Sequence, residues 1–253
     1  MIGATLARVY LTGGIRMDGP DGGFVDADLP GNQGRLAFAA LAIERRPISH
    51  DQLAEIVWGE ELPNRWKGSL AAVVSKIRTL VTSIGLDGRE VIHSSGSTYA
   101  LVLPPTSWVD LEEAHQELDR AEGAWRHGDA EAATRHATVA SSILRRPLLA
   151  GIESVWAEGV QARHAEALYR AYITLAGAWN ELGDHQLAAT IAASAIDIDP
   201  LREVGHRRLI AAEVARGDRS AALRAFAHCQ QVLHDELGVE PSADTRAAID
   251  QIA

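Results

Sequence analysis

The chain has 253 residues, of which 47% are hydrophobic and 5% aromatic, which is enough apolar material for one large domain or two ordinary ones. No segment is apolar for the roughly eighteen residues that a membrane span needs. A single cysteine, Cys229, excludes an internal disulfide and is typical of a reducing compartment. We therefore expect a cytoplasmic protein with no membrane partner.

The acidic excess lies in the second half of the chain. Residues 1–104 carry 10 Lys and Arg against 11 Asp and Glu, a net charge of −1, whereas residues 105–253 carry 14 against 23, a net charge of −9. The total of −10 argues against a uniformly basic nucleic-acid binder. DNA binding needs only a local basic face, however, and the near-neutral first half can provide one.

Strands and helices are mixed in the first half. Alternating apolar residues predict a strand over residues 5–11, and glycine-rich turns separate it from two more short strands. Helical spacing then runs from about residue 34 to 46. Ser49 is expected to cap a second helix, because Gln52 three residues later completes a capping box.

A third helix is predicted from about residue 63 to 84. Its apolar residues recur at steps of four, three, four and three, which is the spacing of one buried helix face. They are Leu70, Val74, Ile77, Val81 and Ile84. Gly85 is the expected C-terminal cap. Two short strands over 91–93 and 98–102 flank residues 94–97 and predict a hairpin.

Three helices followed by a hairpin, with a sheet before them, are typical of a winged helix. In such a fold the third helix enters the DNA major groove and the hairpin reaches the adjacent backbone or minor groove. No acid occurs between Asn64 and Ile84, while Lys67, Lys76 and Arg78 supply cations. A solvated helix face is the alternative interpretation of these charges, and the order of elements favours the DNA-reading helix.

The second half is predicted to be an array of helices. Two prolines at 104 and 105 stop both strand and helix. Gly183-Asp184 and Gly217-Asp218 lie 34 residues apart, each before an alanine-rich helix, and Gly128-Asp129 is a third copy at a longer interval. This period is typical of tetratricopeptide repeats, whose stacked pairs leave a concave surface for partners. A helical bundle without repeats is the alternative.

The expected fold is therefore mainly α. It comprises an N-terminal winged helix-turn-helix over 1–104, with a small β-sheet and a wing hairpin. An all-α tetratricopeptide-like repeat domain follows over 105–253.

Several segments are similar to the motifs of one known family. They are 34–42, with an arginine near the start of the first helix; 46–58; 70–80; 96–101; Trp108-Val109-Asp110-Leu111; Pro200-Leu201-Arg202-Glu203; and Glu236-Leu237-Gly238-Val239-Glu240-Pro241-Ser242. Over about residues 6–252 the chain resembles the Streptomyces antibiotic regulatory protein family, which joins an OmpR-type winged helix to a bacterial transcriptional activation domain. Val73 departs from the family, whose recognition helix often carries a polar or basic residue there.

Patterns and resemblance together predict a transcriptional regulator, expected to be an activator, that binds double-stranded DNA. The resemblance implies tandem repeats in promoters, occupied by two protomers. The helical repeats are expected to mediate self-association, as a homodimer on DNA, or contact with RNA polymerase subunits. The residues expected to contact DNA are Arg35, Asn64, Lys67, Ala71, Ser75, Lys76, Arg78, Thr79, Ser95 and Ser97.

Motifs of catalysis are missing from the sequence. It contains no phosphate-binding glycine loop, no paired-cysteine zinc spacing and no nucleophile elbow. We therefore expect no enzyme, no catalytic residue, no cofactor and no metal site. The alternative function is an interaction scaffold, in which helical repeats bind a protein and the winged helix is degenerate.

Overall fold

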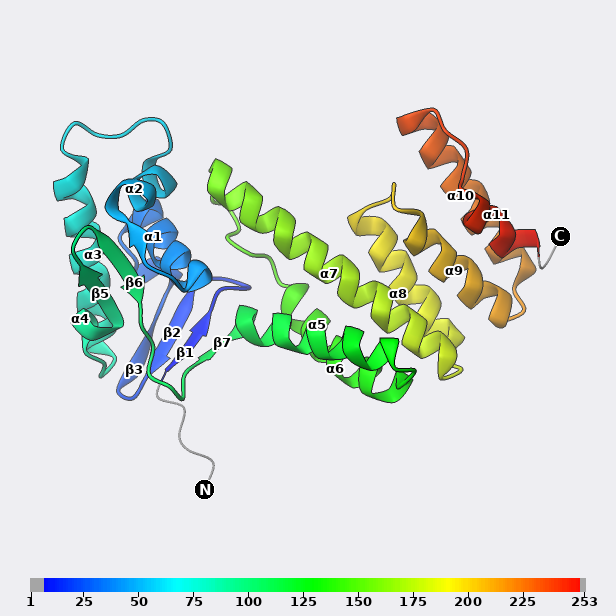
Figure 1. The fold of residues 1–253 in the computed structure, drawn as a ribbon, viewed down its shortest axis with the longest axis horizontal. Coiled ribbons are helices and arrows are strands. Elements are labelled where there is room, and N and C mark those ends of the chain that lie inside the picture. Colours follow the sequence, from blue (N-terminus) through cyan, green and yellow to red (C-terminus); the bar gives the residue numbers. More distant parts are fainter. Residues whose placement is uncertain (1–6, 251–253) are drawn as a thin grey trace, which may run out of the picture. The chain divides into compact units, whose positions relative to one another are not determined.

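The computed structural model of the protein describes residues 7–250 (Figure 1). The chain forms two compact units. Within the described residues, unit 1 comprises 7–113 and Arg146–His164, and unit 2 comprises Ala114–Arg145 and 165–250. The division falls inside two helices, α5 (Asp110–Arg126) and α7 (Val155–Glu181), each of which supplies residues to both units.

Unit 1 opens with a four-stranded sheet. Three antiparallel strands, β1 (Arg8–Tyr10), β2 (Arg16–Gly19) and β3 (Gly22–Val25), are joined by β7 (Trp108–Val109), which runs parallel to β1. The strand order is β3-β2-β1-β7. β1 lies within the strand predicted over 5–11, of which residues 5 and 6 fall outside the described residues. β7 was not expected, because two residues give no detectable alternation.

Asp110 holds this returning segment against β1. Its buried carboxylate accepts hydrogen bonds from the backbone N–H of Leu11 at 2.9 Å and of Thr12 at 3.1 Å, and from the Thr12 hydroxyl at 2.7 Å. A carboxylate that accepts three hydrogen bonds is well compensated for its burial. The Trp-Val-Asp-Leu motif of the sequence therefore ties the start of α5 to the first sheet.

Four helices follow in unit 1: α1 (Gly31–Glu44), α2 (His50–Trp58), α3 (Trp66–Ser83) and the short α4 (Gly88–Val91). The predicted capping box is confirmed, since the Ser49 hydroxyl accepts from the Gln52 N–H at 3.1 Å. The predicted apolar stripe of α3 is confirmed as well, because its five residues are all buried. Gly85 has a positive φ of 86° after the last turn of α3, as its expected capping role requires.

The wing is a second, three-stranded sheet. It consists of β4 (Ile48–Ser49), β5 (Ile92–Ser95) and β6 (Thr98–Leu101), in the order β4-β6-β5. The β5–β6 hairpin is the predicted one. α4 was not predicted, and a glycine allows it to pack on α3: a Cβ at Gly88 would lie 2.2 Å from the carbonyl oxygen of Arg78.

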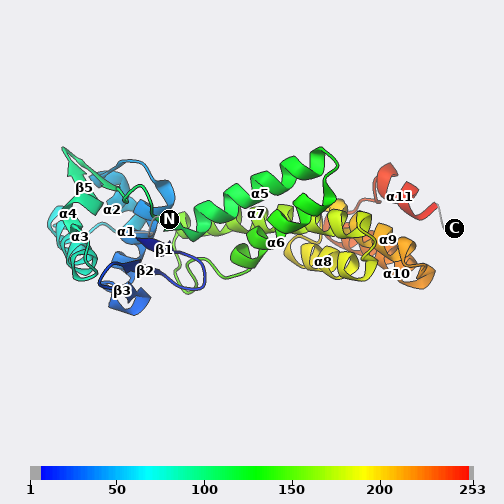
Figure 2. The same cartoon turned by 90° about the horizontal axis from the view of Figure 1, so that it is seen from below.

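Unit 2 is built from helices alone in its described residues. These helices are α6 (Ala130–Leu144), α8 (His185–Ile198), α9 (Glu203–Ala215), α10 (Arg219–Leu237) and α11 (Ala243–Asp250), together with the later parts of α5 and α7. Figures 1 and 2 show α8, α9 and α10 lying side by side.

The Gly-Asp turns of unit 2 repeat one local structure three times. Gly128, Gly183 and Gly217 have φ values of 76°, 87° and 77°. Each following aspartate caps the next helix, accepting from a backbone N–H three residues on, as Asp184 does from Leu187 at 3.0 Å. The repeat predicted from the sequence is confirmed as three helical pairs, α5–α6, α7–α8 and α9–α10. The fold is thus a winged helix with small sheets followed by helical repeats, as expected.

Candidate nucleic-acid interface

The exposed side of α3 carries solvated cations. Lys67 and Lys76 are exposed, and neither forms an ion pair or hydrogen bond with any residue from 7 to 250. The Lys67 ammonium lies 5.4 Å from the centre of the Trp66 ring. Because no acid occurs between residues 64 and 84, no carboxylate of α3 itself offsets these charges.

Small and hydroxyl side chains lie between these cations. Ala71, Ser75 and Thr79 are exposed on α3, and Asn64 is exposed in the loop before it. The Thr79 hydroxyl donates to the Ser75 carbonyl at 3.1 Å, so its oxygen can still accept a hydrogen bond. The structure therefore brings together five of the expected contact residues, Lys67, Ala71, Ser75, Lys76 and Thr79, along a single helix.

Arg78 is largely engaged inside unit 1. It is half-buried, its Nε and Nη2 donate to the Ile92 carbonyl at 3.0 and 2.7 Å, and its guanidinium lies 5.8 Å from the centre of the Tyr99 ring. These bonds join α3 to β5 of the wing. The side chain therefore sets the position of the hairpin relative to the helix and leaves Nη1 available.

Arg35 lies on α1, apart from the α3 residues. Its Nε donates to Asp26 at 2.8 Å, Nη1 to Asn32 at 3.3 Å and Nη2 to the carbonyl of Ala150 at 3.3 Å. Each guanidinium nitrogen therefore has a partner within unit 1, which a sequence pattern could not reveal.

The tip of the wing is exposed and uncharged. Ser95, Gly96 and Ser97 are exposed, and Gly96 has a positive φ of 56°. The carbonyl of Ser97 accepts from the His50 N–H at 2.8 Å, which connects the tip to the start of α2. Hydroxyls and backbone N–H groups are thus the polar groups that this tip offers.

Two cations near α3 were missed by the sequence reasoning. Arg65 is exposed just before the helix, eleven residues from Lys76 and thus about three turns away on the same face. Arg89, exposed on α4, borders a hollow of about 610 Å³ that is also lined by Ser75, Thr79 and the carboxylate-bearing Asp87. Arg65 could have been found from its place in the acid-free stretch. Arg89 could not, because its position beside α3 depends on how α4 packs.

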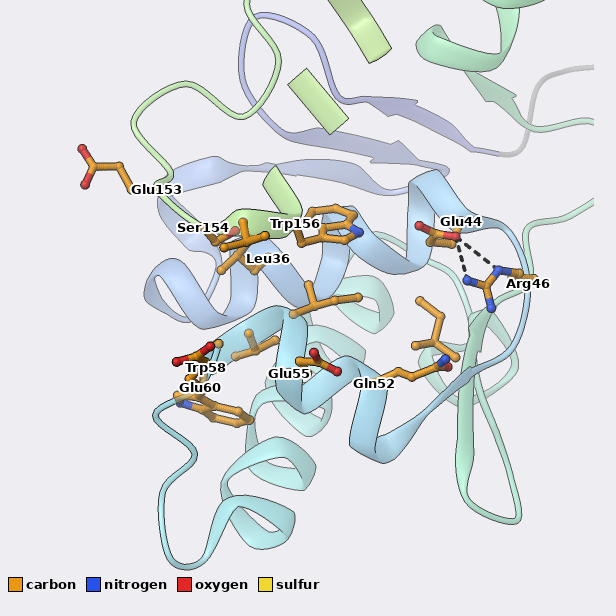
Figure 3. Close-up of a pocket in the computed structure, with 15 residues that line it drawn as sticks. Leu36, Glu44, Arg46, Gln52, Glu55, Trp58, Glu60, Glu153, Ser154 and Trp156 are labelled. Atoms are coloured by element: carbon orange, nitrogen blue, oxygen red, sulfur yellow. Dashed lines mark hydrogen bonds and ion pairs between the residues drawn. The ribbon is translucent and has the colours of Figure 1, made fainter. Parts of the chain in front are cut away.

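A larger hollow in unit 1 is lined by acidic residues, in contrast to the cationic side of α3 (Figure 3). It measures about 650 Å³ and lies between α1, α2 and residues 153–156. Its charged lining residues are Glu44, Arg46, Glu55, Glu60 and Glu153, and it contains the rings of Trp58 and Trp156. Arg46 is paired with Glu44 at 3.1 Å, so the other three carboxylates dominate. Such a lining repels phosphate.

Groups suited to chemistry are not gathered elsewhere in the described residues. No cluster of three or more His, Cys, Asp or Glu there could hold a metal ion. Burial, aided by the nearby Glu203 carboxylate, raises the pKa of the Cys229 thiol to about 11, which keeps it protonated near neutral pH. No helix among residues 7–250 is long and apolar enough to cross a membrane.

Comparison with known proteins places the chain in a family. Residues 109–253, more than half of the chain, match the bacterial transcriptional activator domain. The transcriptional regulatory protein EmbR of Mycobacterium bovis is 29% identical over 222 residues, which are 86% of this chain and 56% of that protein. The regulatory protein AfsR of Streptomyces coelicolor is 28% identical over 217 residues, 83% of this chain and 20% of that protein.

A solved structure is also similar. The structure of Mycobacterium tuberculosis EmbR in complex with a low affinity phosphopeptide has a TM-score of 0.87 and 26% identity, covering 98% of this chain and 65% of that one. The chain spans about half the length of the EmbR relative, 56%. The chain belongs to the bacterial transcriptional activator domain family, as a regulator of the Streptomyces antibiotic regulatory protein type.

Proposed function

We propose that this regulator binds double-stranded DNA, with α3 in the major groove and the β5–β6 hairpin on the adjacent backbone. The observation that carries the proposal is the exposed, acid-free face of α3, whose two lysines pair with no carboxylate in the described part of the chain. Lysines that neutralise phosphates release condensed counterions, and this release drives binding. The acidic hollow beside α1 and α2 makes that other face unsuitable for DNA.

The contact residues divide by chemistry. Arg65, Lys67 and Lys76 bind phosphates, since their side chains are long, charged and solvated. Ala71, Ser75 and Thr79 face base edges, where a methyl group suits thymine and a hydroxyl suits several bases. Asn64 lies in the loop just before the helix, where its amide can reach the DNA backbone.

The remaining expected residues act at the edges of this interface. Arg78 positions the wing through Ile92 and reaches DNA only with Nη1. Arg35 acts as a positioning residue, because its guanidinium is bonded to Asp26. Ser95 and Ser97 contact the backbone weakly, and Arg89 adds a phosphate contact beside α3.

Such an interface favours two protomers acting together. Few cations face the DNA and the total charge is −10, so one protomer is expected to bind modestly. Linked binding to adjacent sites multiplies the affinities of single sites. We therefore propose cooperative occupancy of tandem repeats in one orientation, spaced by about one helical turn of DNA so that both α3 helices meet the same face.

The helical repeats are proposed to hold the protomers together or to contact RNA polymerase subunits, giving activation. Stacked helical pairs commonly bind proteins. The net charge of −9 over residues 105–253 keeps this half away from phosphates.

A titration against the chain's own upstream DNA tests the proposal. DNA with two repeats should bind more tightly per site than DNA with one, and inserting half a turn, about 5 base pairs, should abolish the gain. Equal affinity per site in all three DNAs would show that the protomers act independently. A folded protein that binds none of them would favour the interaction scaffold instead.

A further inference from the structure

One face of α7 is lined by ion pairs with its neighbours in unit 2. The Nε and Nη2 of Arg170 donate to the two carboxylate oxygens of Glu122 on α5, at 2.8 and 2.7 Å. Four residues earlier on α7, Glu166 is paired with Arg202, which precedes α9. The first helices of the three pairs, α5, α7 and α9, are therefore joined by charges that satisfy one another.

Arg208 of α9 lies against the same face of α7 at Gly177, about two turns beyond Arg170. A Cβ added to Gly177 would lie 3.0 Å from the Arg208 Cζ and 3.0 Å from the Trp125 Cζ2. The guanidinium is 5.3 Å from the centre of the Trp125 ring. It is thus held between an aromatic ring of α5 and the bare backbone of α7, which fixes its position.

This guanidinium has no anionic partner among residues 7–250. Arg208 forms no ion pair or hydrogen bond there, and its Nε is buried without an acceptor. Burial first, and the neighbouring cation of Arg207 second, lower the pKa of Arg208. A half-buried charge without a partner is unfavourable, and the two other arginines of this face, Arg170 and Arg202, do have carboxylates.

We propose that Arg208 anchors a carboxylate-binding site for a peptide segment of a partner protein. The ligand group is an Asp or Glu side chain or a C-terminal carboxylate, bound by the guanidinium, with apolar atoms of the peptide against Trp125. A single carboxylate matches a single guanidinium. A dianionic phosphate would leave excess charge near Glu122, which lies one turn before Trp125 on α5.

The proposal rests on the protein-binding role proposed for the helical repeats and is independent of DNA binding. It also accounts for a glycine at position 177, since a side chain there would displace the Arg208 guanidinium from the Trp125 ring. Gly177→Ala is accordingly expected to weaken carboxylate binding while Arg208 is still present.

The test uses the full chain and a random heptapeptide phage library, with selection on the wild type and counter-selection on Arg208→Gln. Arg216→Gln is the matched control, an arginine of the same region already paired with Glu213. Peptides with a carboxylate should be enriched on the wild type and on the control but not on Arg208→Gln. Replacing that Asp or Glu by its amide, or capping the terminus, should lower affinity in fluorescence anisotropy by about tenfold or more.

Thermal melting and DNA binding separate this site from a structural role. Arg208→Gln should melt at or above the wild-type temperature, because the substitution leaves no carboxylate of residues 7–250 without its cation. Its affinity for DNA should be unchanged. If Arg208→Gln unfolds, Arg208→Lys decides: it keeps the charge, and it should bind the selected peptides about tenfold more weakly because it lacks the planar fork.

Equal binding by the wild type and a folded Arg208→Gln, or full binding by Arg208→Lys, overturns the proposal. Enriched peptides without a carboxylate overturn it too, but leave the protein-binding role intact. Failure to enrich any peptide on the wild type removes both.

Discussion

The recognition helix α3 and the helical repeats of unit 2 keep their cations in different surroundings. Lys76 extends into solvent with no carboxylate partner among the described residues, whereas Arg170 is held by both oxygens of Glu122. An exposed ammonium stays hydrated, so it needs no internal partner. A half-buried guanidinium loses water and requires one. Pairing, rather than net charge, therefore distinguishes cations that hold the architecture from cations available to an external ligand.

The largest expected effect on function is weaker DNA binding by the double variant Lys67→Ala/Lys76→Ala. Loss of two phosphate contacts should weaken binding about 10- to 100-fold at low salt and reduce the salt slope by about 2. The melting temperature should stay unchanged, because both side chains are solvated. Gel shifts at several salt concentrations measure this. Arg46→Ala, which removes a cation paired with Glu44, is the control and should bind normally. Unchanged affinity in the double variant would refute the assignment of α3.

The largest expected effect on stability concerns a buried anion of unit 1. Asp110→Ala leaves the Leu11 and Thr12 N–H groups without an acceptor. We expect a loss of about 2–4 kcal/mol in the free energy of unfolding. Urea unfolding followed by tryptophan fluorescence checks this, with the exposed Asp21→Ala as control. A loss as small as the control's would mean that the carboxylate does not hold β7 to β1.

A repeat turn of unit 2 should show a smaller effect. Asp218→Ala removes the cap of α10, in which the carboxylate accepts from the Ala221 N–H at 2.8 Å. The cost should be about 1 kcal/mol, because the bond is only partly buried and water can replace the acceptor. Asp235→Ala, exposed within α10, serves as the control in the same denaturation assay. Equal stability of the two variants would show that the cap contributes nothing.

The smallest effect is the reactivity of a thiol. With a pKa of about 11, Cys229 is a thiolate in roughly one molecule in a thousand at pH 8. Because the pKa is raised, alkylation by iodoacetamide should be negligible at neutral pH and increase as the pH rises toward 11. Mass spectrometry measures the labelled fraction, and protein unfolded in urea should be labelled rapidly. Fast labelling of the folded chain at pH 7 would show that the thiol is accessible.

Local features of this fold were predictable from the sequence. The Ser49 capping box, the apolar stripe of α3 and the three Gly-Asp turns each depend on residues within about four helical turns of one another. The acid-free run from 64 to 84 likewise marked α3 as the candidate reader. These predictions hold because helix spacing and capping are properties of short segments.

Partners far apart in the chain were decided by tertiary structure. Asp110 accepts from Leu11, 99 residues away, so no local pattern could predict β7 or its anchor. The expected reader Arg78 is engaged by the Ile92 carbonyl. Among residues 7–250 Arg208 has no carboxylate partner, although Arg170, on a facing helix, has one. The sequence determined which residues are charged and on which helix they lie. Only the packing of helices and strands determined which of those charges have a partner, because a charged side chain is desolvated, and its partner is supplied, by the elements that pack against it.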